Sequence, residues 1–327
     1  MKNRYILLSI IAAGALLTAC NSRPTVESTP VEIARLDRMV YNFPGMDSAT
    51  RVAMIDSMWP GLEAMSVVFK TPLAKDTALT SFSGKTAVRM FTPEVERRFP
   101  DLDSLQSAIG GVYALMAREI PSVKPPRLYG IVAPYNNSMF MVDTVMLISL
   151  NHYLGADFEG YSYFPPFERV LKRPDMLPYD LTEAIVAINY PYQPAAGATA
   201  LSRMLYEGAL THAKMQLVPE ATEENALGYD SSQLRWLDDN EGRIWNELIT
   251  RQLLYSTDPR DADRLVMPSP ATTLINQQAP GRAGRYVGYQ IVKSYLKKHP
   301  ETTMEQLLNS TFYNSQTTLQ ESGYAPK

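Results

Sequence analysis

Cysteine and histidine are scarce in this chain of 327 residues, which contains one Cys and three His. A single thiol cannot form an internal disulfide, so the hydrophobic core must stabilise the fold on its own. His152, His212 and His299 have no companion at the spacing of zinc ligands, and the one cysteine is Cys20. The sequence therefore argues against a dedicated transition-metal site and predicts no cofactor.

Basic residues and linkers are also in short supply. The chain has 31 Lys and Arg against 34 Asp and Glu, which argues against a nucleic-acid partner because such proteins carry a basic face. No Gly-rich or Ser-rich linker interrupts residues 31–327, so we expect one globular domain there. No Gly-Xaa-Ser-Xaa-Gly elbow occurs, and residues 281–284 lack the Lys-Ser/Thr ending of a phosphate loop.

The N-terminus has the pattern of an export signal. Lys2 and Arg4 precede an apolar run over residues 6–19, which is too short to cross a bilayer as a permanent anchor. Ala19 directly before Cys20, with Leu17 three positions before it, resembles the bacterial lipoprotein signal. That resemblance implies cleavage before Cys20 and acylation of its thiol and amine, with palmitate among the expected chains.

Residues 1–19 are then a signal peptide, residues 20–30 a lipidated tether and residues 31–327 the globular domain. No later apolar run approaches the roughly 20 residues that a membrane span needs, so lipid on Cys20 is the predicted sole anchor. Two or more acyl chains make such attachment stable. No acidic cluster follows Cys20, so we expect an outer-membrane protein that faces the periplasm.

Hydrophobic periodicity predicts an α+β fold that is mostly helical. Residues 47–69 read as two short helices, because Pro60 ends one and suits the first turn of the next. Asp103 is expected to cap a helix with its apolar side chains on one face. Short β-branched runs at 127–133, 139–142 and 145–150 predict a small antiparallel sheet. Helical spacing returns in the segments 181–188, 201–217, 234–255 and 286–298.

Several short segments follow one another in a characteristic order over residues 130–327. They are Tyr153-Leu154-Gly155-Ala156-Asp157, Trp236-Leu237, Asn240-Glu241, Ile244-Trp245, the stretch 253–258, Ala279-Pro280-Gly281-Arg282-Ala283-Gly284, the stretch 288–295 and Tyr324-Ala325-Pro326-Lys327. Together with the lipoprotein leader, this series resembles the GldB-type gliding-motility lipoproteins of Bacteroidetes. The resemblance implies an envelope lipoprotein that assists gliding or an associated secretion apparatus. Members also occur in bacteria not known to glide.

The family is more remotely similar to predicted zinc peptidases, in which a helix carries two His four residues apart with a Glu beside the first. The matching positions hold Ser202, Arg203 and Tyr206. A neutral hydroxyl cannot replace imidazole as a zinc ligand, and a guanidinium cannot accept a proton. The resemblance therefore implies a pseudoenzyme with a degenerate zincin-like fold. His212 alone does not restore a zinc site, because one ligand is too few to hold the metal.

Arg282 and Arg285 stand apart from the packing motif that surrounds them. Gly284 and Gly288 are four residues apart and suit the close approach of another helix, so packing is the preferred interpretation of this motif. The two arginines suit contact with an anion or a partner protein. The alternative is that they neutralise an internal acidic group such as Asp238 or Glu241.

Five Asp-Ser/Thr-aliphatic triplets resemble the O-glycosylation sequon of exported Bacteroidetes proteins. Their hydroxyl residues are Ser48, Ser57, Thr77, Ser104 and Thr144. Helix capping and turns are the alternative explanation, because Asp and Ser are favoured there.

The leading functional prediction is a non-enzymatic, lipid-anchored envelope protein that works through contacts with other envelope proteins in a gliding or secretion-related assembly. The first alternative is an envelope peptidase or glycosidase with a non-standard site. Glu207 with Asp180 and Glu183 would supply a carboxylate pair, and a pocket gathering Glu207, Tyr206, His212 and Arg282 would favour this alternative. The second alternative is a periplasmic ligand binder that uses the aromatic stretch 161–167.

Overall fold

The computed structural model describes residues 27–133 and 137–326. The predicted signal peptide, Cys20 and the first part of the tether lie outside these residues. Within the described ranges, no helix has both the length and the apolar character needed to cross a membrane.

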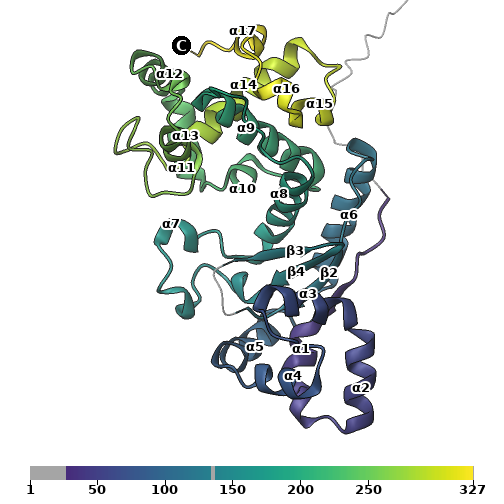
Figure 1. The fold of residues 1–327 in the computed structure, drawn as a ribbon. Coiled ribbons are helices and arrows are strands. Elements are labelled where there is room, and N and C mark those ends of the chain that lie inside the picture. Colours follow the sequence, from purple (N-terminus) through teal and green to yellow (C-terminus); the bar gives the residue numbers. More distant parts are fainter. Residues whose placement is uncertain (1–26, 134–136, 327) are drawn as a thin grey trace, which may run out of the picture.

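A small sheet lies between two groups of helices (Figure 1). Its strands β1 (Ile33–Arg35), β2 (Arg127–Ile131), β3 (Met139–Val142) and β4 (Val145–Ser149) are arranged in the order β1-β2-β4-β3. The strand β2 runs parallel to both β1 and β4, whereas β3 and β4 are antiparallel. The α+β class and the three predicted strands are confirmed. The expectation of a purely antiparallel sheet is wrong, because β3 pairs with the outer edge of β4 and leaves the other edge to β2.

The first group of helices packs on one face of the sheet. It comprises α1 (Leu36–Asn42), α2 (Ser48–Ser57), α3 (Trp59–Phe69), α4 (Asp76–Ser83) and α5 (Thr86–Arg98). Alternate strand residues such as Tyr129 and Leu147 join the core on this side, while Leu128 and Met146 point into the larger core on the other side. This alternation follows from the two-residue period of a strand.

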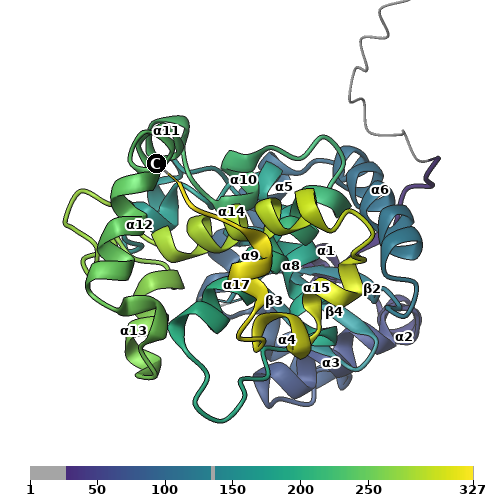
Figure 2. The same ribbon diagram turned by 90° about the horizontal axis from the view of Figure 1, so that it is seen from above.

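The larger core contains α6 and the helices that follow the sheet. They are α6 (Asp103–Glu119), which precedes β2, then α7 (Pro166–Arg169), α8 (Leu177–Asn189), α9 (Ala200–Leu217), α10 (Glu223–Leu227), α11 (Ser231–Asp239), α12 (Glu241–Thr250), α13 (Pro259–Val266), α14 (Ala283–Lys298), α15 (Met304–Leu308), α16 (Ser310–Tyr313) and α17 (Thr318–Ser322). From above, α9 and α14 lie near the centre of this group, with α11, α12 and α13 on one side and α15 on the other (Figure 2).

The central helices α9 and α14 approach each other closely because each carries a glycine at the contact. A Cβ on Gly288 would lie 1.9 Å from the carbonyl oxygen of Met204, and one on Gly208 would lie 2.3 Å from the carbonyl carbon of Gly288. No side chain fits at such distances, so the backbones themselves are in contact. The predicted close approach at Gly288 is confirmed.

Pro60 and Asp47 lie at the beginnings of helices, whereas Asp103 is not a helix cap. Pro60 lies in the first turn of α3, and the side chain of Asp47 caps α2 by accepting from the amides of Ala49 and Thr50. The prediction that Asp103 caps α6 is wrong: Asp103 is the first helical residue, and its amide donates to the Asp101 carboxylate.

The segment 234–255 is also not one helix. It divides at Asn240, whose side chain donates to the carbonyl oxygen of Trp236 at 2.6 Å. Ile244 and Leu248 are buried, whereas Trp236 and Trp245 are only partly covered.

Candidate functional site

The three positions that match the zinc motif are engaged in internal hydrogen bonds along α9. Ser202 Oγ donates to Asn314 Oδ1 at 2.9 Å and accepts from the hydroxyl of Tyr192 at 3.1 Å. The Tyr206 hydroxyl donates to the carbonyl oxygen of Tyr190 at 2.9 Å. These contacts tie α9 to the chain before it and to the C-terminal helices, so the motif positions have structural partners.

The surroundings of α9 are mainly helical. Its main neighbours are α14, α8 and α13, rather than the strands of the sheet. In the described part of the chain, no group of three or more His, Cys, Asp or Glu is placed to hold a metal ion. His212 is half-buried and does not line the pocket described below.

Five charged side chains from three helices form what we call the central ion network. They are Glu183 on α8, Arg203, Glu207 and Lys214 on α9, and Arg285 on α14. Arg285 lies at its centre: its Nη2 is 3.0 Å from Glu183 Oε1 and also pairs with Glu207. Lys214 Nζ lies 2.6 Å from Glu183 Oε2, and Arg203 Nη2 lies 2.8 Å from Glu207 Oε1.

Burial of these charges carries a desolvation cost, which the ion pairs of the network must offset. The side chain of Glu207 is 3% exposed and that of Arg285 is 11% exposed. Burial alone would raise the pKa of Glu183, but the charges of Arg285 and Lys214 outweigh it and hold that pKa well below its ordinary value. Burial likewise opposes the charge on Arg285, yet its two carboxylate neighbours raise its pKa. Glu183 and Arg285 therefore stabilise each other's charged form.

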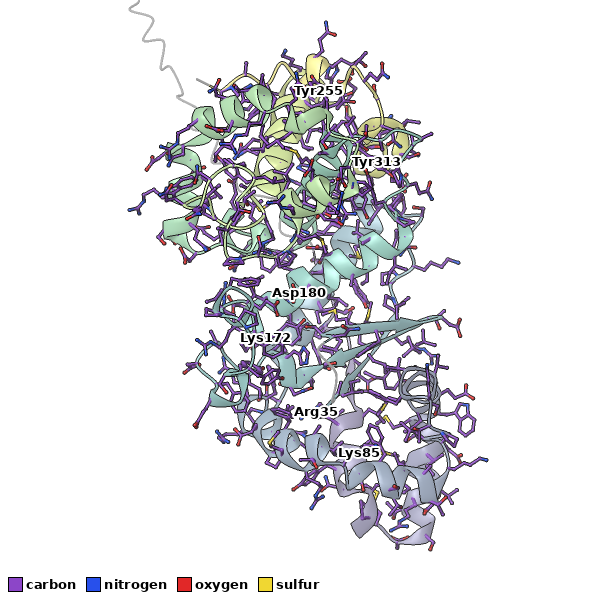
Figure 3. All side chains as sticks on the ribbon, turned by 60° about the vertical axis from the view of Figure 1, so that its left-hand side comes forward. Arg35, Lys85, Lys172, Asp180, Tyr255 and Tyr313 are labelled. Atoms are coloured by element: carbon purple, nitrogen blue, oxygen red, sulfur yellow. The ribbon has the colours of Figure 1, made fainter. Side chains whose placement is uncertain are left out.

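Asp180 lies one turn before Glu183 on α8 and forms no ion pair with any described residue. Tyr153 donates its hydroxyl to Asp180 Oδ2 at 2.9 Å. Burial, together with the nearby charge of Glu183, raises the pKa of Asp180 to about 6. Asp180 lies between the upper helices and the sheet, near Lys172 (Figure 3). It is therefore the carboxyl group of this region best suited to proton transfer near neutral pH.

A pocket of about 620 Å³ opens over these groups, and we call it the central pocket. Its charged lining comprises the central ion network with Asp180 and Arg282. The remaining lining is mostly apolar or aromatic: Met139, Leu171, Met176, Ala184, Ala187, Pro191, Tyr192, Tyr206, Leu210, Met267 and Pro268. This volume and this mixture of walls are typical of small-molecule sites. The pocket gathers Glu207, Tyr206 and Arg282, as the hydrolase hypothesis requires, but not His212.

The two arginines that stood out in the sequence have different environments. Arg285 neutralises acidic groups, but these are Glu183 and Glu207, so the suggested partners Asp238 and Glu241 are wrong. Those two carboxylates instead accept from tyrosine hydroxyls at 2.8 Å and 2.7 Å.

Arg282 precedes α14 with a left-handed backbone, at φ +66°. Its Nη2 donates to the carbonyl oxygen of Gly228 at 2.6 Å, and its guanidinium lies over the ring of Tyr229. Among the described residues, Arg282 forms no ion pair. Burial lowers its pKa, because no carboxylate compensates the charge at close range.

The aromatic stretch 161–167 serves mainly to pack the chain. The hydroxyl of Tyr161 donates to the carbonyl oxygen of Asn151 at 2.6 Å and accepts from the amide of Leu154 at 3.0 Å. Its ring contacts Phe158 and Phe164. The hydroxyl and ring of Tyr161 are therefore engaged in contacts within the fold. The walls of the central pocket come from residues outside the stretch 161–167.

The five predicted O-glycosylation residues are all exposed: Ser48, Ser57, Thr77, Ser104 and Thr144. Exposure permits modification and does not test it, so glycosylation stays a prediction.

Lys214 and Tyr153 belong to the site but were missed in the sequence. Lys214 follows Glu207 by seven residues on α9, so both lie on the same helix face. A charged pair on an otherwise apolar helix face was the signal that could have revealed Lys214. Tyr153 belongs to one of the family-like segments, but nothing local shows its role, because its partner Asp180 is 27 residues away.

Comparison with known proteins defines the family of this α+β, mostly helical chain. The model of a family described as gliding motility protein GldB matches residues 19–326. The chain therefore belongs to the GldB gliding-motility family, and the predicted membership is confirmed. The more remote kinship with zinc peptidases stays a prediction. Neither the curated proteins nor the solved structures give a match.

Proposed function

We propose that this protein is a non-enzymatic, lipid-anchored envelope protein that assists a gliding-motility or secretion-related assembly through protein contacts. The observation that carries the proposal is how the chain uses the three positions that match the zinc motif of the remotely similar peptidases. Ser202 and Tyr206 bond to other parts of the chain, and Arg203 pairs with Glu207. A helix committed to such contacts supports a scaffold role, and membership of a gliding-motility family supports the biological setting.

Cys20 is the proposed point of attachment. The family match begins at residue 19 and so includes the predicted lipidation residue. Acyl chains on Cys20, palmitate among them, would hold the domain at the outer membrane, and we place the domain on its periplasmic side. Two or more chains would make this attachment stable.

A hydrolase is the second candidate, and one observation favours it. Asp180 lines a pocket of about 620 Å³ and has a pKa of about 6, which suits a general acid or base. Glu183 and Glu207, in contrast, are already engaged by basic groups. A hydrolytic mechanism would therefore depend on Asp180.

Replacing Cys20 with Ala tests the anchor and the partner contacts together. We expect the Cys20→Ala protein to retain its leader, to lack acyl mass and to leave the outer-membrane fraction. The wild-type chain, cross-linked in intact cells, should be captured with a reproducible set of envelope proteins that the variant loses. Intact-mass spectrometry and quantitative proteomics measure both outcomes.

The neighbouring Ser22→Ala substitution serves as the control and should behave as wild type. An acyl-free wild-type protein would contradict the anchor. A wild-type protein that cross-links only to itself would contradict the role in an assembly.

A further inference from the structure

The charges that line the central pocket do not balance. Four basic side chains (Arg203, Lys214, Arg282 and Arg285) face three acidic ones (Asp180, Glu183 and Glu207), so the formal charge is 4 − 3 = +1. The whole chain, in contrast, has a formal charge of −3. A cationic pocket in an acidic protein selects for an anionic ligand.

The excess positive charge lies on the side of Arg282. Arg203, Lys214 and Arg285 form ion pairs with Glu183 and Glu207. Within the described residues, Arg282 contacts a carbonyl oxygen and the face of a tyrosine ring but no carboxylate. Arg282 is half-buried, and a guanidinium that is partly removed from water without a carboxylate carries a desolvation penalty that a ligand anion would offset. The Arg282 guanidinium can therefore bind an anionic ligand through its N–H donors and its positive charge.

Arg285, beside Arg282 in the lining of the pocket, has one unsatisfied donor. Its Nε is buried and has no hydrogen-bond partner among the described residues. A buried donor without an acceptor costs about 1–3 kcal/mol, and most native structures avoid it. Because this atom has almost no accessible surface, a ligand in the pocket does not reach it, and the assignment of the anion rests on Arg282.

The apolar lining of the central pocket indicates the chemistry of the rest of the ligand, beyond its anionic group. Ala184, Ala187 and Leu210 present small or aliphatic groups to the pocket, and Met139 and Met176 add flexible side chains. Met267 and Pro268 are exposed and lie at the pocket's outer part. Such walls can bury a hydrocarbon body that is joined to the anion.

We propose that the central pocket binds a small monocarboxylate with an aliphatic body, with its carboxylate at Arg282 and its hydrocarbon part against α8 and α9. A carboxylate matches the planar donor fork of a guanidinium, and one negative charge balances the formal +1 of the pocket. The site is separate from the proposed partner contacts and does not depend on them.

Octanoate is a suitable probe, and isothermal titration calorimetry at pH 7 with the mature protein measures its binding. We expect Arg282→Gln to weaken octanoate binding at least tenfold, or about 1.4 kcal/mol. Arg264→Gln, at an exposed arginine outside the pocket, is the matched control and should bind as wild type. Ala187→Leu should also weaken binding, because it fills the apolar wall without touching a charge. A thermal melt of each variant verifies that it is folded.

Three further ligands identify the chemistry that is recognised. Octanol and octylamine should bind much more weakly than octanoate, and octyl phosphate should bind no better. Equal binding of octanol, or unchanged octanoate binding in Arg282→Gln, would overturn the assignment of Arg282. Tighter binding of octyl phosphate would overturn the carboxylate assignment, and no binding of octanoate to the wild-type protein would overturn the site.

Discussion

Replacing Arg285 with Met is expected to lower the free energy of unfolding by about 3–5 kcal/mol, a large share of the stability of a typical domain. Arg285 holds Glu183 and Glu207 together, and the second of these side chains is 3% exposed. Methionine keeps much of the volume of arginine but leaves both carboxylates short of a counter-charge. Urea denaturation followed by circular dichroism gives the free energy.

Arg260→Met is the matched control, because Arg260 pairs with Asp258 while its side chain is 87% exposed. Water screens such a pair, so we expect little or no change. Adding Glu207→Gln to the Arg285 variant should cost less than the two single changes summed, since the two groups are coupled. Additive effects, or a loss no larger than that of the control, would show that the central ion network does not stabilise the fold.

Replacing Gly288 with Ala should destabilise the protein by about 3 kcal/mol or more, although alanine is the better helix former. The added Cβ would lie 1.9 Å from the carbonyl oxygen of Met204 on α9. That oxygen belongs to helix backbone, so the clash can be relieved only by moving α9 and α14 apart. The movement would loosen the largest helix contact of the fold.

Gly45→Ala provides the comparison, because a Cβ at Gly45 has nothing within 4 Å. We expect its melting temperature to stay close to that of the wild type, while that of Gly288→Ala falls by many degrees. A Gly288→Ala protein as stable as the wild type would mean that the two backbones are not in contact.

Much of the secondary structure could be predicted because it follows from local patterns in the sequence. The period of the apolar residues indicated the strands after residue 127 and the helices before and after them, and Pro60 marked a helix boundary. The order and direction of the strands could not be predicted from local periodicity. Whether β2 pairs with β3 or with β4 depends on contacts across the whole sheet, and the prediction of an antiparallel sheet missed the parallel pairs of β2.

The site was predicted only in pieces. Arg282 and Arg285 stood out as charges inside a packing motif, and Glu183 and Glu207 were noted as carboxylates. Their arrangement was hidden, because Arg285 meets Glu183 across 102 residues of sequence. A single sequence shows which residues are unusual on their helix face, but not which of them meet.

Asp180→Asn tests the non-enzymatic account most directly, and its stability must be known first. A carboxyl with a raised pKa holds its proton more tightly in the native state, so its stabilising contribution is complete below about pH 4 and is lost as the pH rises through about 6. Asparagine has no such proton and can still accept from Tyr153. The variant should match the wild type near pH 4 and exceed it by about 1–3 kcal/mol at pH 8.

The decisive measurement is complementation of a deletion strain with this stable variant, scored by colony spreading and by the profile of secreted proteins. Arg285→Met serves as the destabilised reference. The account predicts that Asp180→Asn restores both phenotypes as fully as the wild-type gene. Failure of a folded, correctly localised Asp180→Asn protein to restore them would contradict it and favour a hydrolase that depends on Asp180.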